Sequence, residues 1–454
     1  MVEARKGNFF QRWLYRNYRQ GSALGNFFRR RIRPTAWLWM GMGGLSVITG
    51  ADLRLSVVVA FSLLMLGILA VGLMWALLRR AQVVATRDLP DTGSVGEELS
   101  YFVSVTNVGK RTLREIHFRE QGDDPRPTEW EFVNLKEPGE EDRNIFDRAL
   151  AYYRWKWLKE RGGKWKSLGR SEALNLGGGE SEEVRLKLIP KRRGVLVLDD
   201  LRVELPDPFG LFQRCRPTGN EAGEILVIPR RYKLPPLDLG GQSDLKIGGE
   251  TASTVKGEGG EFMGLREYRP GDSPRHMHWK AWARTGQPIV KEFEEVRFPR
   301  YGLVLDTNLR GSGPELFEEA ISVAASFVSS IDRERCLLDL MFVRDEPQVF
   351  TAGRGVAKAD RLMEILARTE GNDQGGYDLL KSLVLRYATE MTACVVVLTG
   401  WDEEREELVE SLRQSGMKVH LYVIGAGEMP EEEGLFGAHW IRWDAVQEDL
   451  MKSA

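Results

Sequence analysis

Cysteine is scarce in this chain of 454 residues. The three cysteines, Cys215, Cys336 and Cys394, lie far apart and within apolar runs. This spacing matches neither a disulfide framework nor a metal site, so it excludes a disulfide-stabilised secreted domain and favours a reducing compartment. We interpret all three cysteines as small buried hydrophobic residues.

Net charge is also nearly absent. The 64 basic and 66 acidic residues leave a formal charge of −2 at pH 7. This balance argues against a nucleic-acid-binding protein for the chain as a whole. The 42% hydrophobic and 29% charged residues are typical of a folded protein, and the length suffices for two or three domains.

The sequence lacks a recognisable catalytic constellation. Its five histidines are scattered, and no serine–histidine–aspartate or cysteine–histidine set has a suggestive spacing. His276 and His278 are two residues apart, so on a helix they would point to different faces and would not chelate one metal ion. We therefore predict a protein that is not an enzyme and needs no cofactor.

Charged residues are missing from two stretches near the N-terminus. Residues 35–49 are uncharged and apolar, although this run is short for a membrane span. Residues 55–78 exceed the roughly 20 apolar residues that cross a bilayer, and Arg79 and Arg80 end the run. We expect a transmembrane helical hairpin over residues 35–80, since two runs behind a long basic segment exclude a cleavable signal peptide.

The segment before the hairpin, residues 1–34, combines basic and aromatic side chains. Because basic residues flank the hairpin on both sides, the positive-inside rule places all soluble domains in the cytoplasm, beside the inner membrane. Two interpretations of the segment remain open: an interfacial segment on anionic lipid, or a disordered cytosolic tail. Its basic residues are Arg5, Lys6, Arg12, Arg16, Arg19, Arg29, Arg30, Arg31 and Arg33, and its aromatic residues are Phe9, Phe10, Trp13, Tyr15, Tyr18, Phe27 and Phe28.

Alternating apolar and polar residues between positions 81 and 230 predict an all-β sandwich. The alternation fails over about residues 136–179, which we interpret as an insertion with a helix over residues 140–161. We expect the apolar side chains of this helix to pack on the sandwich, with contact to the membrane as the alternative. These side chains are Ile145, Phe146, Leu150, Tyr153, Trp157 and Leu158.

Glycine is abundant between residues 231 and 260, where apolar residues are few. No strand leads into these glycines and no Lys-Ser or Lys-Thr pair follows them, so a linker is favoured over a phosphate-binding loop. The linker leads to a dense segment of polar and aromatic residues at positions 261–299.

This dense segment begins with a turn. Residues 269–272, Arg-Pro-Gly-Asp, have the composition of a type II turn, because proline fixes φ and glycine supplies a positive φ. Ser273 and Pro274 predict the start of a short helix that reaches about Arg284 and is closed by Gly286. His278 and Trp282 would share one face of it.

Residues 300–454 alternate between apolar strands and helical patterns. Strands are expected near residues 301–306, 337–343, 393–398 and 418–424, with helices between them. This alternation predicts a parallel sheet that is covered by helices on both faces.

The dense segment resembles the signature of the bacterial domain-of-unknown-function 58 family, and residues 207–212, Asp-Pro-Phe-Gly-Leu-Phe, match it as well. The residues that carry the resemblance are Gly271, Asp272, Arg275, His278, Trp279, Lys280, Ala283, Arg284, Thr285, Gly286, Lys291, Glu292, Phe293 and Glu294. We expect an interaction or structural role for Arg266, Glu267, Tyr268, Gly271, Asp272, Arg275, His278, Trp279, Lys280, Arg284, Gly286 and Glu292.

The resemblance implies a von Willebrand factor A-like fold for residues 300–454. Such domains often bind Mg²⁺ through oxygen ligands after the first strand. Here the corresponding positions are Asp306, Asn308 and Arg310, and the positive charge of Arg310 makes this metal site degenerate. We expect no metal, with Asp306 paired to Arg310 or capping the following loop.

Three functional hypotheses follow. The first is a non-enzymatic, membrane-anchored interaction protein, whose partners by resemblance are a MoxR-type AAA+ ATPase and a transglutaminase-like membrane protein. The second is an envelope-associated enzyme that uses Asp272, His278, Lys280 and Glu292. The third is a Mg²⁺-dependent, adhesion-type ligand binder, which Arg310 and a cytoplasmic location disfavour.

Overall fold

The computed structural model divides the chain into two compact units, residues 1–230 and 231–454, which we describe separately. The residues it describes are 8–49, 56–122, 124–236, 239, 261–294, 299–310, 313–331, 336–353, 359–372, 376–430 and 435–453. The expected glycine-rich linker therefore lies almost wholly outside the described residues.

The first unit contains β sheets around one apolar core. Its strands form a five-stranded sheet in the order β11-β1-β3-β7-β5, a four-stranded sheet in the order β10-β9-β4-β6 and a three-stranded sheet in the order β2-β12-β8. The bounds are β1 Val83–Asp88, β2 Thr92–Ser94, β3 Leu99–Asn107, β4 Leu113–Glu120, β5 Trp165–Ser167, β6 Leu174–Leu176, β7 Ser181–Pro190, β8 Gly194–Leu198, β9 Leu201–Pro206, β10 Gln213–Pro217, β11 Gly219–Asn220 and β12 Gly223–Ile228.

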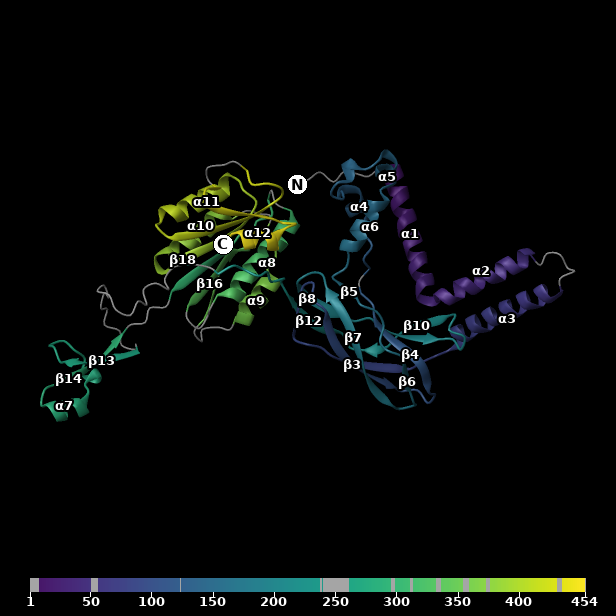
Figure 1. Ribbon diagram of the computed structural model, residues 1–454, viewed down its shortest axis with the longest axis horizontal. Coiled ribbons are helices and arrows are strands. Elements are labelled where there is room, and N and C mark those ends of the chain that lie inside the picture. The colour runs from purple at the N-terminus through teal and green to yellow at the C-terminus, as the bar shows by residue number, and fades with distance from the viewer. Residues whose placement is uncertain are drawn as a thin grey trace. The chain divides into compact units, whose positions relative to one another are not determined.

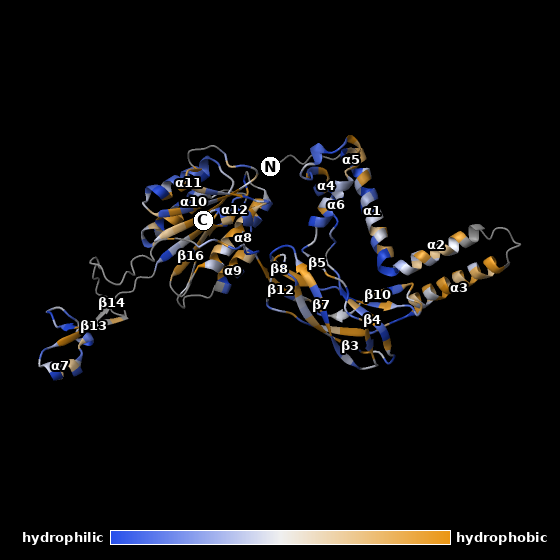
Figure 2. Cartoon of the chain, in the orientation of Figure 1, coloured by the Kyte–Doolittle hydropathy of each residue, from blue (hydrophilic) through white to orange (hydrophobic). Residues whose placement is uncertain are grey.

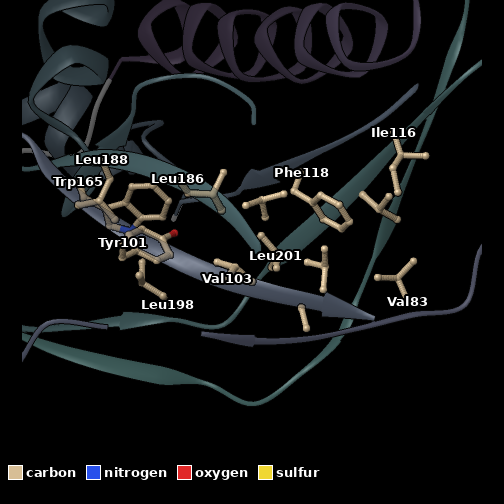
Figure 3. Close-up of a cluster of buried hydrophobic side chains, with 14 of the residues drawn as sticks. Val83, Tyr101, Val103, Ile116, Phe118, Trp165, Leu186, Leu188, Leu198 and Leu201 are labelled. Atoms are coloured by element: carbon tan, nitrogen blue, oxygen red, sulfur yellow. The ribbon is translucent and has the colours of Figure 1, made fainter. Parts of the chain in front are cut away.

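Alternation along the strands builds this core. In β3 the side chains of Tyr101 and Val103 are buried, whereas Phe102 between them is exposed. Successive side chains of a strand point to opposite faces, so every second residue of β3 enters the core. Figure 3 shows Val103 near Phe118 of β4 and Leu201 of β9, which are buried in the same cluster.

The helical insertion is interrupted rather than continuous. The structure has α4 (Glu129–Asn134), a 3₁₀ turn (Glu140–Asp142), α5 (Ile145–Leu150) and α6 (Tyr152–Arg161). The prediction of one helix over residues 140–161 is wrong, because Ala151 adopts a left-handed conformation with φ 49° and ends α5. A left-handed residue cannot continue a right-handed helix.

The helices of the insertion pack on the N-terminal helix, whereas β5 and β6, which also lie within residues 136–179, belong to the sheets of the sandwich. Helix α1 (Phe9–Arg31) buries Leu14 and Tyr15 in one cluster with Phe132, Trp155 and Leu158. Figure 1 shows α4 and α6 beside α1. The expectation of packing on the sandwich is therefore wrong, and so is the disordered-tail interpretation of residues 9–31.

Two apolar helices follow α1. Helix α2 (Pro34–Thr49) contacts α3 (Ser56–Leu78), and both appear largely apolar in Figure 2. Within α3, residues Val57–Leu78 have a mean hydropathy of 2.7 and are only 17% buried, so this stretch is long and apolar enough to cross a membrane. Among the described helices it is the one that meets this criterion.

The second unit begins with a hairpin. Strands β13 (Glu261–Glu267) and β14 (Ile289–Glu294) are antiparallel, and between them lie a 3₁₀ turn (Pro274–His276) and α7 (Trp279–Thr285). We call residues 261–294 the signature hairpin. Ser273 and Pro274 do start a helical turn, as expected, but it is the 3₁₀ turn; the expected continuous helix to Arg284 is wrong, because α7 begins only at Trp279.

A six-stranded sheet fills the rest of the second unit. Its order is β17-β16-β15-β18-β19-β20, and every pairing is parallel except that of the edge strand β17 with β16. The strands are β15 Arg300–Leu305, β16 Leu337–Val343, β17 Pro347–Ala352, β18 Ala393–Thr399, β19 Lys418–Gly425 and β20 Ala438–Arg442, and the helices are α8 Pro314–Ser330, α9 Ala359–Arg368, α10 Tyr377–Tyr387, α11 Glu403–Gln414 and α12 Val446–Lys452.

Helices cover both faces of this sheet, as the alternating pattern predicts. In β19, Leu421 and Val423 join the cluster under α10 and α11. Tyr422 between them packs on Phe327 of α8, with ring centroids 4.9 Å apart. Neighbouring strand residues point to opposite faces, so α8 lies on one side of the sheet and α10 and α11 on the other.

Candidate functional site

The carboxyl ends of β15 and β18 define the first candidate site. These two strands are neighbours, and the chain order runs outward from them in both directions. In open α/β sheets, ligands bind outside the strand ends at such a switch point. Asp306 follows β15 and Thr399 ends β18, and both side chains are buried there.

The carboxylate of Asp306 is surrounded by donors. Its Oδ2 accepts hydrogen bonds from Arg405 Nε at 2.9 Å and from Tyr377 Oη at 2.8 Å. The same oxygen accepts from Thr399 Oγ1 at 2.8 Å, while Oδ1 accepts the backbone N–H of Asn308 at 2.9 Å. The expectation that Asp306 caps the following loop is confirmed by this last bond.

Arg405 enters the site from α11. Asp402 caps this helix by accepting the backbone N–H of Arg405 at 3.0 Å, and its carboxylate also accepts from the Arg405 guanidinium. The Arg405 side chain is only 2% exposed. One buried cation thus lies between two carboxylates, which offsets the cost of its burial.

Burial and charge set the protonation of this site. Burial raises the pKa of Tyr377 well above its usual range, and the neighbouring Asp306 carboxylate raises it further. Burial alone would lower the pKa of Arg405, but Asp306, Tyr377 and Asp402 together outweigh burial, so the pKa is raised. Tyr377 therefore remains a hydrogen-bond donor and Arg405 remains charged.

This arrangement corrects one prediction about the degenerate metal positions. The described ionic partner of Asp306 is Arg405, not Arg310, whose side chain is exposed. Arg310 contributes its backbone N–H, which Asn308 Oδ1 accepts at 3.0 Å. No group of three or more histidine, cysteine or acidic residues suited to a metal occurs in the described part of the chain.

Sequence reasoning missed Arg405, although a signal was present. Leu408, Val409 and Leu412 form the buried face of α11. Arg405 lies three, four and seven residues before them, so it belongs to the same helical face. An arginine on the apolar face of a helix needs a buried acidic partner. Its partner, Asp306, lies 99 residues away in the chain, so no local pattern identifies it.

The signature hairpin is the second candidate site. Asp272 accepts two hydrogen bonds from the Arg266 guanidinium, at 2.8 and 2.9 Å, and one from the backbone N–H of Arg269 at 2.8 Å. The expected turn is confirmed by the φ of 105° at Gly271 and by the Asp272 N–H to Arg269 carbonyl bond of 3.0 Å. The arginine that pairs with Asp272 is Arg266, not Arg275 or Arg284 as expected, and the latter two are exposed.

His278 serves as the N-cap of α7. Its Nδ1 accepts the backbone N–H of Ala281 at 3.0 Å, and its own backbone N–H donates to Ile289 at 2.8 Å. His278 therefore precedes the helix, and the prediction that it shares a helical face with Trp282 is wrong. Trp279 is 63% exposed and stacks on Trp282, with ring centroids 5.4 Å apart.

The remaining signature residues are dispersed over the hairpin. Glu267 ends β13, and the N–H of Tyr268 donates to the Pro288 carbonyl at 2.9 Å. Lys280 is exposed on α7, and Gly286 closes this helix with a φ of 72°. The backbone of Glu292 belongs to β14, but its side chain lies outside the described residues.

The comparisons with known proteins agree with this signature. The family model described as "Protein of unknown function DUF58" matches residues 264–433, which include most of the signature hairpin and of the sheet. The uncharacterized protein YeaD of Bacillus subtilis is 30% identical over 103 residues, which are 23% of this chain. Residues 264–433 of this chain thus match the DUF58 family, and the match with YeaD spans about a quarter (25%) of that protein's length.

Solved structures give weaker likenesses. The CARDB domain of a Pyrococcus furiosus protein is 10% identical with a TM-score of 0.17, covering 33% of this chain and 89% of that chain. A cohesin module from a Clostridium perfringens family 33 glycoside hydrolase is 12% identical with a TM-score of 0.17, covering 33% of this chain and 98% of that chain. Scores this low carry no argument about fold or function.

Proposed function

We propose that this chain is a membrane-anchored interaction protein without catalytic activity. The observation that carries the proposal is the buried side chain of Arg405, which fills the switch point where ligands of α/β sheets bind. An internal guanidinium, held by Asp306 and Asp402, takes the place of a ligand.

Two of the four residues of the enzyme hypothesis, Asp272 and His278, have structural contacts, which also supports this proposal. The carboxylate of Asp272 is engaged by Arg266 and by a backbone N–H. The imidazole of His278 accepts a hydrogen bond at the start of α7. A general base needs a free lone pair near its substrate, and both groups already accept hydrogen bonds from within the hairpin.

We further propose that residues 300–454 form a von Willebrand factor A-like domain. The strand order with one antiparallel edge strand, β17, supports this assignment, as does the position of Asp306 after β15. In the proposed domain Arg405 supplies the positive charge that Mg²⁺ supplies in metal-binding relatives. Partner binding would then require no metal.

The proposed partners are a MoxR-type AAA+ ATPase and a transglutaminase-like membrane protein, both from the family resemblance. The signature hairpin offers the contact surface that we propose for the ATPase. Trp279 is exposed there, beside the exposed basic residues Lys280 and Arg284. Tryptophan and arginine are the residue types that most often dominate the energy of protein interfaces.

The proposed anchor is a hairpin of α2 and α3 with both ends in the cytoplasm. Support comes from the hydropathy and exposure of α3 and from the contact of α2 with it. Helix α1 adds support, because the face opposite its buried Tyr15 carries the exposed residues Trp13, Leu24 and Phe27. A helix with such a stripe and several arginines suits the membrane interface.

Thermal unfolding with Mg²⁺ or Mn²⁺ tests the closed switch point. A bound ion at about a hundredfold excess over its dissociation constant would stabilise the fold by about 2.7 kcal/mol. We expect no saturable shift for the wild-type chain. We expect one for Arg405→Ala, which leaves the oxygens of Asp306, Asn308 and Asp402 around an open site.

The control variant is Arg361→Ala, because Arg361 is exposed on α9 and makes no ion pair within the described residues. It should respond to the metal as the wild type does. A saturable stabilisation of the wild type that disappears in Asp306→Ala would contradict the proposal.

A further inference from the structure

A cavity of about 1690 Å³ opens where α3 meets the sandwich. Its walls come from the end of α3, from the turn between β3 and β4, and from the segments around Pro206 and Pro217. All of these residues belong to the first unit of the chain. The cavity is separate from both sites described above.

The polar lining of this cavity is strongly positive. Five basic residues of the lining are exposed and make no ion pair with any other described residue. They are Arg80, Lys110, Arg111, Arg114 and Arg216. The two acidic lining residues are Asp207 and Glu115, and the Asp207 carboxylate accepts the N–H groups of Leu211 and Phe212 at 2.7 and 2.8 Å. The cavity thus has an excess of positive charge that the described residues do not neutralise.

Local structure holds this lining in place. Arg79 bridges two walls, since its guanidinium donates to the carbonyl of Pro206 and, at 3.1 Å, to that of Arg114. The pairing of β4 with β6 shifts register between Leu113 and Ile116, and Glu115 within this bulge has a φ of 52°. Bulges redirect side chains, and a strained residue that persists is held by its surroundings.

The position of the cavity on α3 indicates its ligand. The 22 residues Val57–Leu78 would extend for about 33 Å, close to the roughly 30 Å of a bilayer's hydrocarbon core. The exposed apolar residues Trp75 and Leu78 line the cavity on one side, and Arg80 follows at once. A membrane crossed by α3 therefore places this cavity at the level of the lipid headgroups, where tryptophan is enriched.

We propose that the cavity binds the headgroup of an anionic phospholipid. The phosphate would meet Arg111 and Arg114, while the glycerol and the start of the acyl chains lie against Trp75 and Leu78. Basic residues beside a membrane helix favour anionic over zwitterionic lipid. This inference rests on the membrane anchoring proposed above.

Lipid titration of the full chain in a neutral detergent tests the inference. Short-chain phosphatidylglycerol should raise the melting temperature saturably, whereas phosphatidylcholine of the same chain length should not. The double variant Arg111→Gln, Arg114→Gln should bind phosphatidylglycerol about thirtyfold more weakly, because it loses the attraction of two basic residues for an anionic surface.

The matched control is Arg361→Gln, Arg386→Gln, which removes the same charge from two exposed arginines that have no ion pair within the described residues. It should bind as the wild type does. Equal effects of the two lipids, or an unchanged affinity in the cavity variant, would overturn the inference. So would inorganic phosphate that binds as tightly as the lipid. A failure of the anchoring itself would be distinguishable, because the wild-type chain would then appear in the soluble fraction without detergent.

Discussion

Arg405 is the residue on which the account of the α/β domain depends most. Its guanidinium is buried, bonded to Asp306, and close to the hydroxyl of Thr399 at 3.3 Å. A buried ion pair is not in itself strongly stabilising, because both charges lose their hydration. Removing one partner is costly, however, since the other charge stays buried without compensation.

The exchange Arg405→Met should therefore destabilise the chain by about 3–5 kcal/mol, the usual cost of breaking a buried pair. Methionine keeps much of the side-chain volume, so the loss reports on charge more than on packing. Urea unfolding at pH 7 measures it. The double variant Asp306→Asn, Arg405→Met should recover part of the loss, because it removes the unpaired carboxylate. If the losses of unfolding free energy in the two single variants simply added up in the double variant, the energetic coupling of Asp306 with Arg405 would be contradicted.

At the residue scale, the predictable features were those with local causes. The turn at Gly271 and the helix end at Gly286 follow from residues that tolerate positive φ, and both are confirmed. The partners of Asp306 and Asp272 were not predicted correctly. Arg405 is distant in sequence, and Arg266 precedes the turn on β13, whereas the expectation considered only arginines that follow it.

Among the elements, the signature hairpin owes its shape to Asp272. This carboxylate joins β13 to the turn through Arg266 and the N–H of Arg269. Asp272 is buried, so its removal would take the acceptor away from the Arg269 N–H and from two bonds of the Arg266 guanidinium. We therefore expect the carboxylate of Asp272 to stabilise the signature hairpin.

The variant Asp272→Ala should lower the opening free energy of the hairpin by about 1–3 kcal/mol, the cost of leaving buried donors without acceptors. Hydrogen exchange of the Tyr268 and His278 amides measures this opening, since both N–H groups bond across the hairpin. Arg275→Ala is the control, because Arg275 is exposed in the same segment. Unchanged protection in Asp272→Ala would show that the carboxylate has no structural role.

The helical insertion shows where prediction from sequence fails at this scale. Its residues have good helix propensity, which favoured one helix over residues 140–161. The break occurs at Ala151, a residue that seldom adopts a left-handed conformation and so gives no local warning. The tertiary contacts of Phe132, Trp155 and Leu158 with α1 accompany this break.

For the whole molecule, the alternation of strands and helices predicted the parallel sheet, and the apolar run of residues 55–78 predicted α3. Both patterns extend over many residues, so a few residues that depart from them do not change the prediction. The packing of the insertion on α1 was not predictable, because it joins segments more than a hundred residues apart. Membrane association is supported by one apolar, exposed helix, and the two-span topology remains our proposal.

Recovery of the AAA+ ATPase from membranes tests the central claim most directly. The full chain is purified from gently solubilised membranes, and the co-purifying ATPase is quantified for the wild type and two tryptophan variants. Trp279→Ala removes the exposed tryptophan of the signature hairpin, and Trp130→Ala removes the comparably exposed tryptophan of α4. The account predicts the wild-type amount with Trp130→Ala and a loss of about thirtyfold in affinity, about 2 kcal/mol, with Trp279→Ala at an unchanged melting temperature. Equal recovery with both variants, or no ATPase with the wild type, would contradict it.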